Sequence, residues 1–180
     1  MKDTLIIKQT EQWIKSVVID LNFCPFAAKA VLKKSIRYIV LNEVDIKQTL
    51  DELLDEFRFL DSHEEVETTF IIFGTNFTDF KSYLHLIKKA EKKLELENYD
   101  GIYQIASFHP DYCFAGEDLN DAANYTNRSI YPMLHLLRED SLTKALALYP
   151  SPEKIPEHNI SLAREKGLHY MQMLRLSCMS

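Results

Sequence analysis

Residues 68–73 read TTFIIF, a run of β-branched and aromatic side chains that Gly74 closes. Residues of these types favour a strand, and the lack of polar alternation predicts that the strand is buried on both faces. Such a strand belongs in the interior of a sheet whose two faces are covered by helices. This run is therefore the centre from which the fold is predicted.

Two more strands and two helices are predicted next to this run. Residues 35–41 (SIRYIVL) and 102–108 form short apolar or β-branched runs, and Tyr99-Asp100-Gly101 supplies the turn before the second run. Residues 44–59 and 80–97 place apolar side chains at helical spacing among charged ones, which is typical of surface helices. This order predicts right-handed crossovers and an α/β fold with a small, largely parallel three-stranded sheet flanked by helices, a fourth strand being the alternative.

The remaining segments are predicted to be helical. An amphipathic helix over residues 4–21 ends near Asn22, and a second helix over 27–34 follows Pro25, which leaves Cys24 near its N-cap. The C-terminal third is predicted to be helical, with helices from 129 or 131 to 138, from 141 to 149 and from 158 to 176. The sequence contains no repeat or interdomain linker, so residues 1–180 are expected to form a single domain.

Composition and charge limit the classes of function. The 27 acidic and 21 basic residues give a formal net charge of −6, which argues against nonspecific binding to nucleic acid. No segment approaches the roughly 20 consecutive apolar residues that span a bilayer, and the charged N-terminal stretch is unlike a signal peptide. We therefore expect a cytoplasmic protein that binds neither nucleic acid nor membrane and whose three cysteines are free thiols.

The segment after residue 108 concentrates the reactive side chains. Ligands of α/β sheets bind beyond the carboxyl ends of the strands, and the third predicted strand leads directly into His109-Pro110-Asp111. Pro110 restricts the backbone of His109 and so fixes the direction of its side chain. His109 is the predicted general acid or base, with Asp111 orienting it. The alternative is a turn in which His109 caps a backbone carbonyl.

Four polar residues are predicted to share one face of the following helix, because they lie three, four and three positions apart. They are Arg128, Tyr131, His135 and Arg138. Two cations, one of them near a helix N-terminus, suit a phosphate or carboxylate ligand, and His135 would assist the chemistry. The alternative is a solvated face, or ion pairs between the arginines and the acidic residues of segment 117–121.

Cys24 is the third candidate. A thiol at a helix N-cap has its pKa lowered by the helix dipole and by backbone N–H groups, and the thiolate is the reactive form. His109 would then act as its base if the fold brings the two together. The alternative is that Cys24, which lies between Phe23 and Phe26, is a small hydrophobic residue of the core.

Metal and nucleotide signatures are absent from the sequence. Residues 109, 111 and 113 (His, Asp and Cys) would lie on one side of an extended segment, but no CxxC pair, HExxH or calcium loop accompanies them. We therefore assign no metal ligand. The 4 glycines form neither a dinucleotide-binding nor a phosphate-binding loop. The sequence assigns no cofactor and no oligomeric state.

Six short segments carry a family resemblance. They are residues 21–27 (LNFCPFA), 106–111 (ASFHPD), 124–129 (NYTNRS), 131–132 (YP), 135–138 (HLLR) and 155–159 (IPEHN). Together they resemble the family catalogued as domain of unknown function 1415, from about Trp13 to Leu168. The resemblance implies a mainly bacterial family without an assigned activity. Its recurring polar motifs coincide with Asn22, Cys24, His109, Asp111, Asn127, Arg128, His135 and Arg138.

Three functions fit these candidates. The first is an enzyme that acts on a small anionic substrate bearing phosphate or carboxylate, with acid–base or thiol chemistry. The second is a noncatalytic module that holds such an anion. The third is an interaction protein whose last helix packs against a partner and whose polar residues form a buried network. The predicted catalytic residues are His109, Asp111, Cys24 and His135, and the predicted ligand-binding residues are Arg128, Arg138, Asn127, Asn22 and Tyr131.

Overall fold

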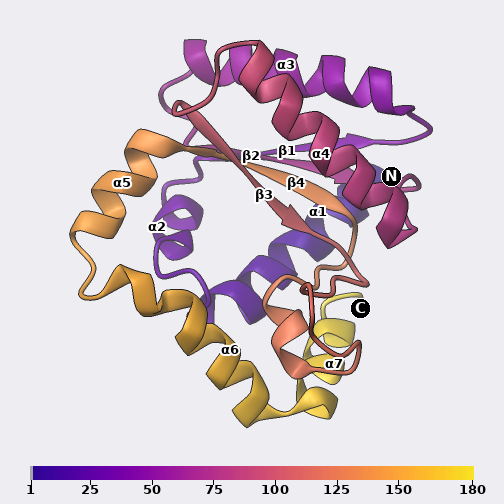
Figure 1. The fold of residues 1–180 in the computed structure, drawn as a ribbon, viewed down its shortest axis with the longest axis vertical. Coiled ribbons are helices and arrows are strands. Elements are labelled where there is room, and N and C mark those ends of the chain that lie inside the picture. The colour runs from indigo at the N-terminus through magenta and orange to yellow at the C-terminus, as the bar shows by residue number, and fades with distance from the viewer. Residues whose placement is uncertain (1) are drawn as a thin grey trace.

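The computed structural model describes residues 2–180 and is built on one four-stranded sheet. The strands are β1 (Ile36–Leu41), β2 (Thr68–Phe73), β3 (Tyr103–Phe108) and β4 (Met133–Arg138), in the order β1-β2-β4-β3. β1 pairs with β2 in parallel, whereas β4 pairs antiparallel with both β2 and β3. The α/β class is confirmed, but the prediction of a largely parallel three-stranded sheet is wrong, because two of the three pairings are antiparallel (Figure 1).

The strand that the sequence-based prediction misses is β4. Its residues, MLHLLR, were expected to be helical because His135 and Arg138 are three positions apart among leucines. In the structure this segment follows Pro132 and pairs on both sides, so that His135 lies opposite Phe70 of β2 and Ala106 of β3. So short an apolar run carries too little periodicity to distinguish a buried strand from a helix. Alternation along β4 sends His135 and Arg138 to opposite faces of the sheet.

The three predicted strands are confirmed, each within one residue of its predicted start. β1, β2 and β3 also run in the same direction, because β4 is antiparallel to both β2 and β3. The prediction did not include a strand between β2 and β3, the position that β4 occupies. The difference therefore lies in strand order and not in the assignment of these three strands.

Helices α3 (Ile46–Ser62) and α4 (Phe80–Leu96) cover one face of the sheet and confirm the two predicted surface helices (Figure 1). Each begins at an aspartate that accepts a backbone hydrogen bond: Asp45 from Gln48 at 2.8 Å and Asp79 from Ser82 at 2.7 Å. The Gln48 side chain also accepts from the Asp45 backbone, which completes a capping box. The side chains that form the core on this face include Leu53, Phe57, Ile71, Phe73, Tyr83, Leu86, Leu134 and Leu136.

The other helices lie on the opposite face (Figure 1). They are α1 (Lys2–Trp13), which the π-helical η1 (Ile14–Ile19) continues, α2 (Ala27–Leu32), α5 (Glu139–Ala147), α6 (Ile155–Lys166) and α7 (Leu168–Ser177), with the short 3-10 segments η2 (Ala122–Thr126) and η3 (Pro152–Lys154). Gly167, at a φ of +84°, divides the predicted helix 158–176 into α6 and α7. Within residues 2–180, no helix is both long and apolar enough to cross a membrane.

Trp13 anchors this second layer. Its ring is fully buried and meets Phe108 edge to face, with ring centroids 5.2 Å apart. Its Nε1 donates a hydrogen bond to the backbone oxygen of Arg128 at 3.2 Å. Phe70 and Met133 belong to the same core. The indole therefore joins α1 to the end of β3 and to the segment before β4.

Candidate functional site

A cavity of about 430 Å³ is lined by residues of α1, α2 and α5 and of the four strands. Most of its lining is apolar and comes from both helices and strands: Trp13, Val18, Phe26, Phe70, Phe108 and Leu142. Ligand sites for small molecules have this size and character, and a small number of polar groups usually orients the ligand. Two reactive side chains line this cavity, those of Cys24 and His135.

His135 enters the cavity wall from the central strand β4. Its ring stacks on Phe70, with centroids 3.9 Å apart and planes 7° from parallel. Nε2 is buried and has no hydrogen-bond partner among residues 2–180. Burial lowers the pKa of His135 to about 3, so the ring is neutral at pH 7. An unpaired buried polar atom costs about 1–3 kcal/mol, and here it belongs to a side chain that lines the cavity.

Cys24 lines the same cavity from the loop before α2. Burial raises the pKa of the Cys24 thiol, and backbone hydrogen bonds from Phe26 and Ala27 oppose that rise with a smaller effect. The direction is opposite to the one predicted for an N-cap thiol. The reason is local: the N-cap of α2 is Phe26, the helix has only 6 residues, and apolar side chains surround the sulfur.

The rate of Cys24 alkylation tests this result. In native protein treated with iodoacetamide at neutral pH, Cys24 should react more slowly than free cysteine, with an apparent pKa above the ordinary value of about 8.5. Peptide mapping by mass spectrometry follows the site as pH is varied. Protein unfolded in urea gives the reference rate, and Cys24→Ser verifies the peptide assignment. Rapid modification with a lowered apparent pKa would instead support the hypothesis that the Cys24 thiol is activated.

His109 lies outside this cavity. The ring is fully buried, Nε2 donates to the backbone oxygen of Phe77 at 2.9 Å, and Nδ1 accepts from the backbone N–H of Asp111 at 3.0 Å. Burial is the largest influence on the His109 pKa and lowers it. Both ring nitrogens are therefore used to shape the turn, while the Asp111 side chain is exposed. This is the arrangement of the alternative prediction, in which His109 caps a carbonyl.

The two predicted anion-binding arginines hold backbone carbonyls instead. Arg128 donates to the oxygens of Tyr112 and Leu119, both at 2.8 Å, and its guanidinium lies over the ring of Tyr125. Arg138 donates through Nη2 to three oxygens near the end of α3, those of Leu60 at 2.6 Å and of His63 and Val66 at 3.1 Å. The predicted helical face that joined them does not exist, because residues 133–138 form a strand.

The other predicted ligand-binding residues form links within the fold. Asn127 donates from Nδ2 to the backbone oxygen of Ser107 at 3.1 Å. Tyr131 donates from its hydroxyl to the side-chain oxygen of Gln9. Asn22, at a φ of +54°, is exposed and lies just after η1. None of these three lines the larger cavity.

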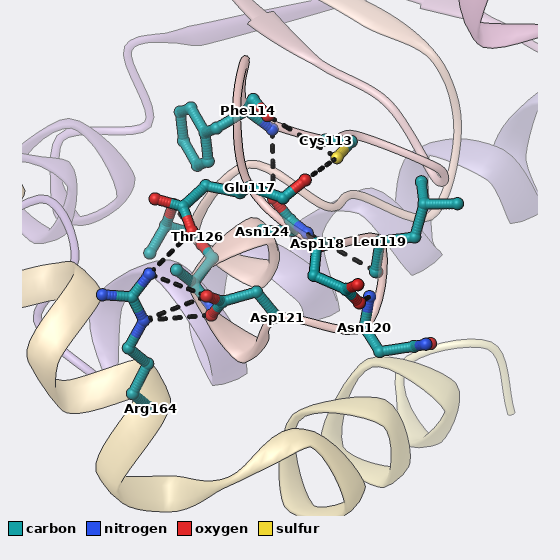
Figure 2. Close-up of polar contacts among 11 residues, drawn as sticks. Cys113, Phe114, Glu117, Asp118, Leu119, Asn120, Asp121, Asn124, Thr126 and Arg164 are labelled. Atoms are coloured by element: carbon teal, nitrogen blue, oxygen red, sulfur yellow. Dashed lines mark hydrogen bonds and ion pairs between the residues drawn. The ribbon is translucent and has the colours of Figure 1, made fainter.

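The acidic loop before η2 is held by Arg164 of α6 (Figure 2). The guanidinium lies 2.7 Å from Asp121 and 2.9 Å from Glu117, and Asp121 also accepts from the backbone N–H of Ala123 at 2.8 Å. These contacts lower the pKa of Asp121 to about 2, the hydrogen bond from Arg164 being the largest cause. Ion pairing of the loop acids was the alternative prediction, but their partner is Arg164, 43 positions from Asp121. No group of three or more His, Cys, Asp or Glu side chains within residues 2–180 is arranged to hold a metal ion.

Of the predicted site residues, Cys24, His135 and Arg138 line the larger cavity, although the guanidinium of Arg138 is bonded to backbone oxygens near the end of α3. His109, Asp111 and Arg128 lie outside this cavity. Prediction from the sequence missed the apolar walls, of which Trp13, Phe70 and Phe108 are examples. Their sequence signal is that of core residues, and only the packing of the helices shows that they border a cavity.

The family model described as "Protein of unknown function (DUF1415)" matches residues 5–173 of the 180 in the chain. Comparisons with curated proteins and with solved structures gave no match. The matched range contains every candidate residue and all six motif segments that carry the predicted resemblance. The chain therefore belongs to this family.

Proposed function

We propose that this protein binds a small organic anion whose apolar body occupies the 430 Å³ cavity and whose polar group forms a hydrogen bond with His135. The observation that carries the proposal is that His135 lines an apolar cavity and has a buried Nε2 without a partner among the described residues 2–180. A neutral imidazole in the Nε2–H tautomer donates to a carboxylate or phosphate oxygen. The stack on Phe70 holds the ring in place for such a ligand.

The charged residues around the cavity support an anionic ligand. Three lysines line the cavity: Lys29 of α2, Lys33 one turn later at the end of that helix, and Lys144 of α5. The lining contains one carboxylate, that of Glu67. Lys144 pairs with Asp140, while Lys29 and Lys33 form no ion pair with residues 2–180. Exposed lysines bind anions weakly but favour their approach. Arg138 also lines the cavity, but its guanidinium is bonded to backbone oxygens, so in this proposal the lysines are the cationic groups that approach the ligand.

Noncatalytic binding is favoured over catalysis because both reactive groups are held in their neutral forms. Burial raises the pKa of Cys24 and lowers that of His135, so neither a thiolate nor an imidazolium is stabilised. A thiol-dependent enzyme is the second candidate, since Cys24 and His135 line one cavity. The interaction hypothesis expects no cavity and an exposed apolar patch on the last helix. Tyr170, Met173 and Leu176 of α7 are exposed, as that hypothesis expects, but the hypothesis gives no role to the cavity.

Titration with decanoate tests the proposal. Trp13 lines the cavity and is the only tryptophan of the chain, so its fluorescence should change saturably as decanoate binds. His135→Phe keeps the aromatic stack and removes the hydrogen bond, and is expected to weaken binding about tenfold. His85→Gln, on the exposed surface of α4, is the control and should bind as wild type does. No saturable change in fluorescence or in calorimetry would contradict the proposal.

A further inference from the structure

A second cavity, of about 290 Å³, adjoins the first. The two share three lining side chains, those of Val18, Cys24 and Phe108. The smaller cavity extends from these residues toward η2 and α6, where it is lined by Asn127 and Asn159. Val18, Cys24 and Phe108 therefore lie where the two cavities meet.

Asn159 lines the smaller cavity and has an unpaired acceptor atom. Its Nδ2 donates to the backbone oxygen of Phe23 at 2.7 Å, and this bond fixes the orientation of the amide. Oδ1 is then an acceptor; it is buried and has no partner among residues 2–180. The other two polar side chains of the cavity are paired, since Asn127 donates to Ser107 and Thr126 donates to Ala123 at 2.9 Å.

We propose that the smaller cavity is a second subsite for the same ligand and receives its hydrogen-bond-donating end, a hydroxyl or N–H group, at Oδ1 of Asn159. The inference rests on the proposed function and adds a substrate class to it. The ligand is bifunctional, with an anionic group at one end, a donor at the other, and an apolar body that passes Val18, Cys24 and Phe108. Each end then satisfies one of two buried polar atoms, Nε2 of His135 and Oδ1 of Asn159.

The test compares ω-hydroxy fatty acids with the unsubstituted acids of equal length, from hexanoate to dodecanoate. Dissociation constants come from the fluorescence of Trp13 and from calorimetry. At the chain length that spans both cavities, the hydroxyl should strengthen binding to wild type by about tenfold, the worth of one buried hydrogen bond. The series also measures the span, because only a hydroxyl that reaches Asn159 brings this gain.

Two substitutions distinguish the role of Oδ1 as an acceptor from the structural hydrogen bond between Nδ2 of Asn159 and Phe23. Asn159→Leu removes Oδ1 and should abolish the preference for the hydroxy acid while the unsubstituted acid still binds. Asn159→Asp has nearly the same shape and keeps acceptor oxygens, but it loses the donor to Phe23 and adds a negative charge. The carboxylate still accepts from the hydroxyl, so the preference should persist. The ratio of the dissociation constants of the two ligands is measured within each variant, so that a loss of stability that weakens both ligands equally does not affect the comparison.

The outcomes distinguish the subsite from the proposed function. Equal affinity of the two ligands at every length, or a preference that survives Asn159→Leu, would overturn the subsite and leave binding in the larger cavity intact. Loss of the preference in both variants would assign Asn159 a purely structural role and would also overturn the subsite. Failure of wild type to bind any acid of either series would contradict the proposed function itself.

Discussion

Replacing Arg138 with alanine is expected to lower the free energy of unfolding by about 3 kcal/mol, because three backbone carbonyls would lose a charged donor together. Nη2 of Arg138 bonds to the oxygens of Leu60, His63 and Val66, and Nε bonds to Val66 at 3.2 Å. These contacts join the end of β4 to the end of α3 and to the turn before β2. Equilibrium unfolding in urea measures the loss.

Two further substitutions test the cause of this loss. Arg138→Lys keeps the positive charge but cannot reproduce the planar set of donors, so its stability should lie between wild type and Arg138→Ala. Arg58→Ala is the matched control, because Arg58 is an exposed arginine of α3 that pairs with the exposed Asp55. Surface pairs of this kind contribute little to stability. Comparable losses for Arg58→Ala and Arg138→Ala would show that the carbonyl contacts are not what stabilises the fold.

Stability is expected to fall as the pH is lowered from about 7 to about 5, and His135 should account for about 2 kcal/mol of the fall. Burial lowers the pKa of His135 to about 3 in the folded protein, whereas an unfolded chain has a histidine pKa of about 6.5. Below the unfolded value, the unfolded state binds more protons than the folded state. The stabilisation is therefore complete above about pH 6.5 and is lost progressively toward about pH 3.

His135→Phe isolates this contribution. The variant should have a shallower dependence of unfolding free energy on pH than wild type, by up to about 1.4 kcal/mol per pH unit. His109 stays in both proteins and contributes in the same direction, since burial lowers its pKa too. The pH interval from about 7 to about 5 lies above the range in which Asp121, with a pKa of about 2, loses its own contribution to stability. Identical slopes for wild type and variant would show that folding does not change the pKa of His135.

Local patterns predict most of this fold and fail where pairing partners decide the outcome. The helices around Leu53 and Leu86 have apolar side chains at helical spacing and capping aspartates, all within a few residues of one another. β4 has no such local signal. Its strand conformation depends on β2 and on β3, whose contacts with Leu134 and Leu136 cannot be read from the six residues MLHLLR.

The same distinction explains the candidate site. Cys24 and His135 were named from their chemical types and positions. The partners predicted for His135 depended on a helix that does not form, and His109, the base predicted for Cys24, does not line the cavity. Arg138 shares β4 with His135, and the alternation of a strand points its side chain to the other face. His109 lies where the sequence predicts, at the end of β3, and its two hydrogen bonds use the nitrogens that catalysis would need.

The position of β4 has a consequence for how the chain reaches its folded state. β4 lies between β2 and β3, so the inner edges of these two strands stay unpaired until residues 133–138 join the sheet. The pairing joins residues far apart in the sequence, such as Thr68 and Leu137. Until then both edges present unpaired N–H and C=O groups, which are templates for association with other chains. Contacts of such long sequence separation slow folding. The step that completes the sheet is thus also the step that protects the nascent protein from aggregation.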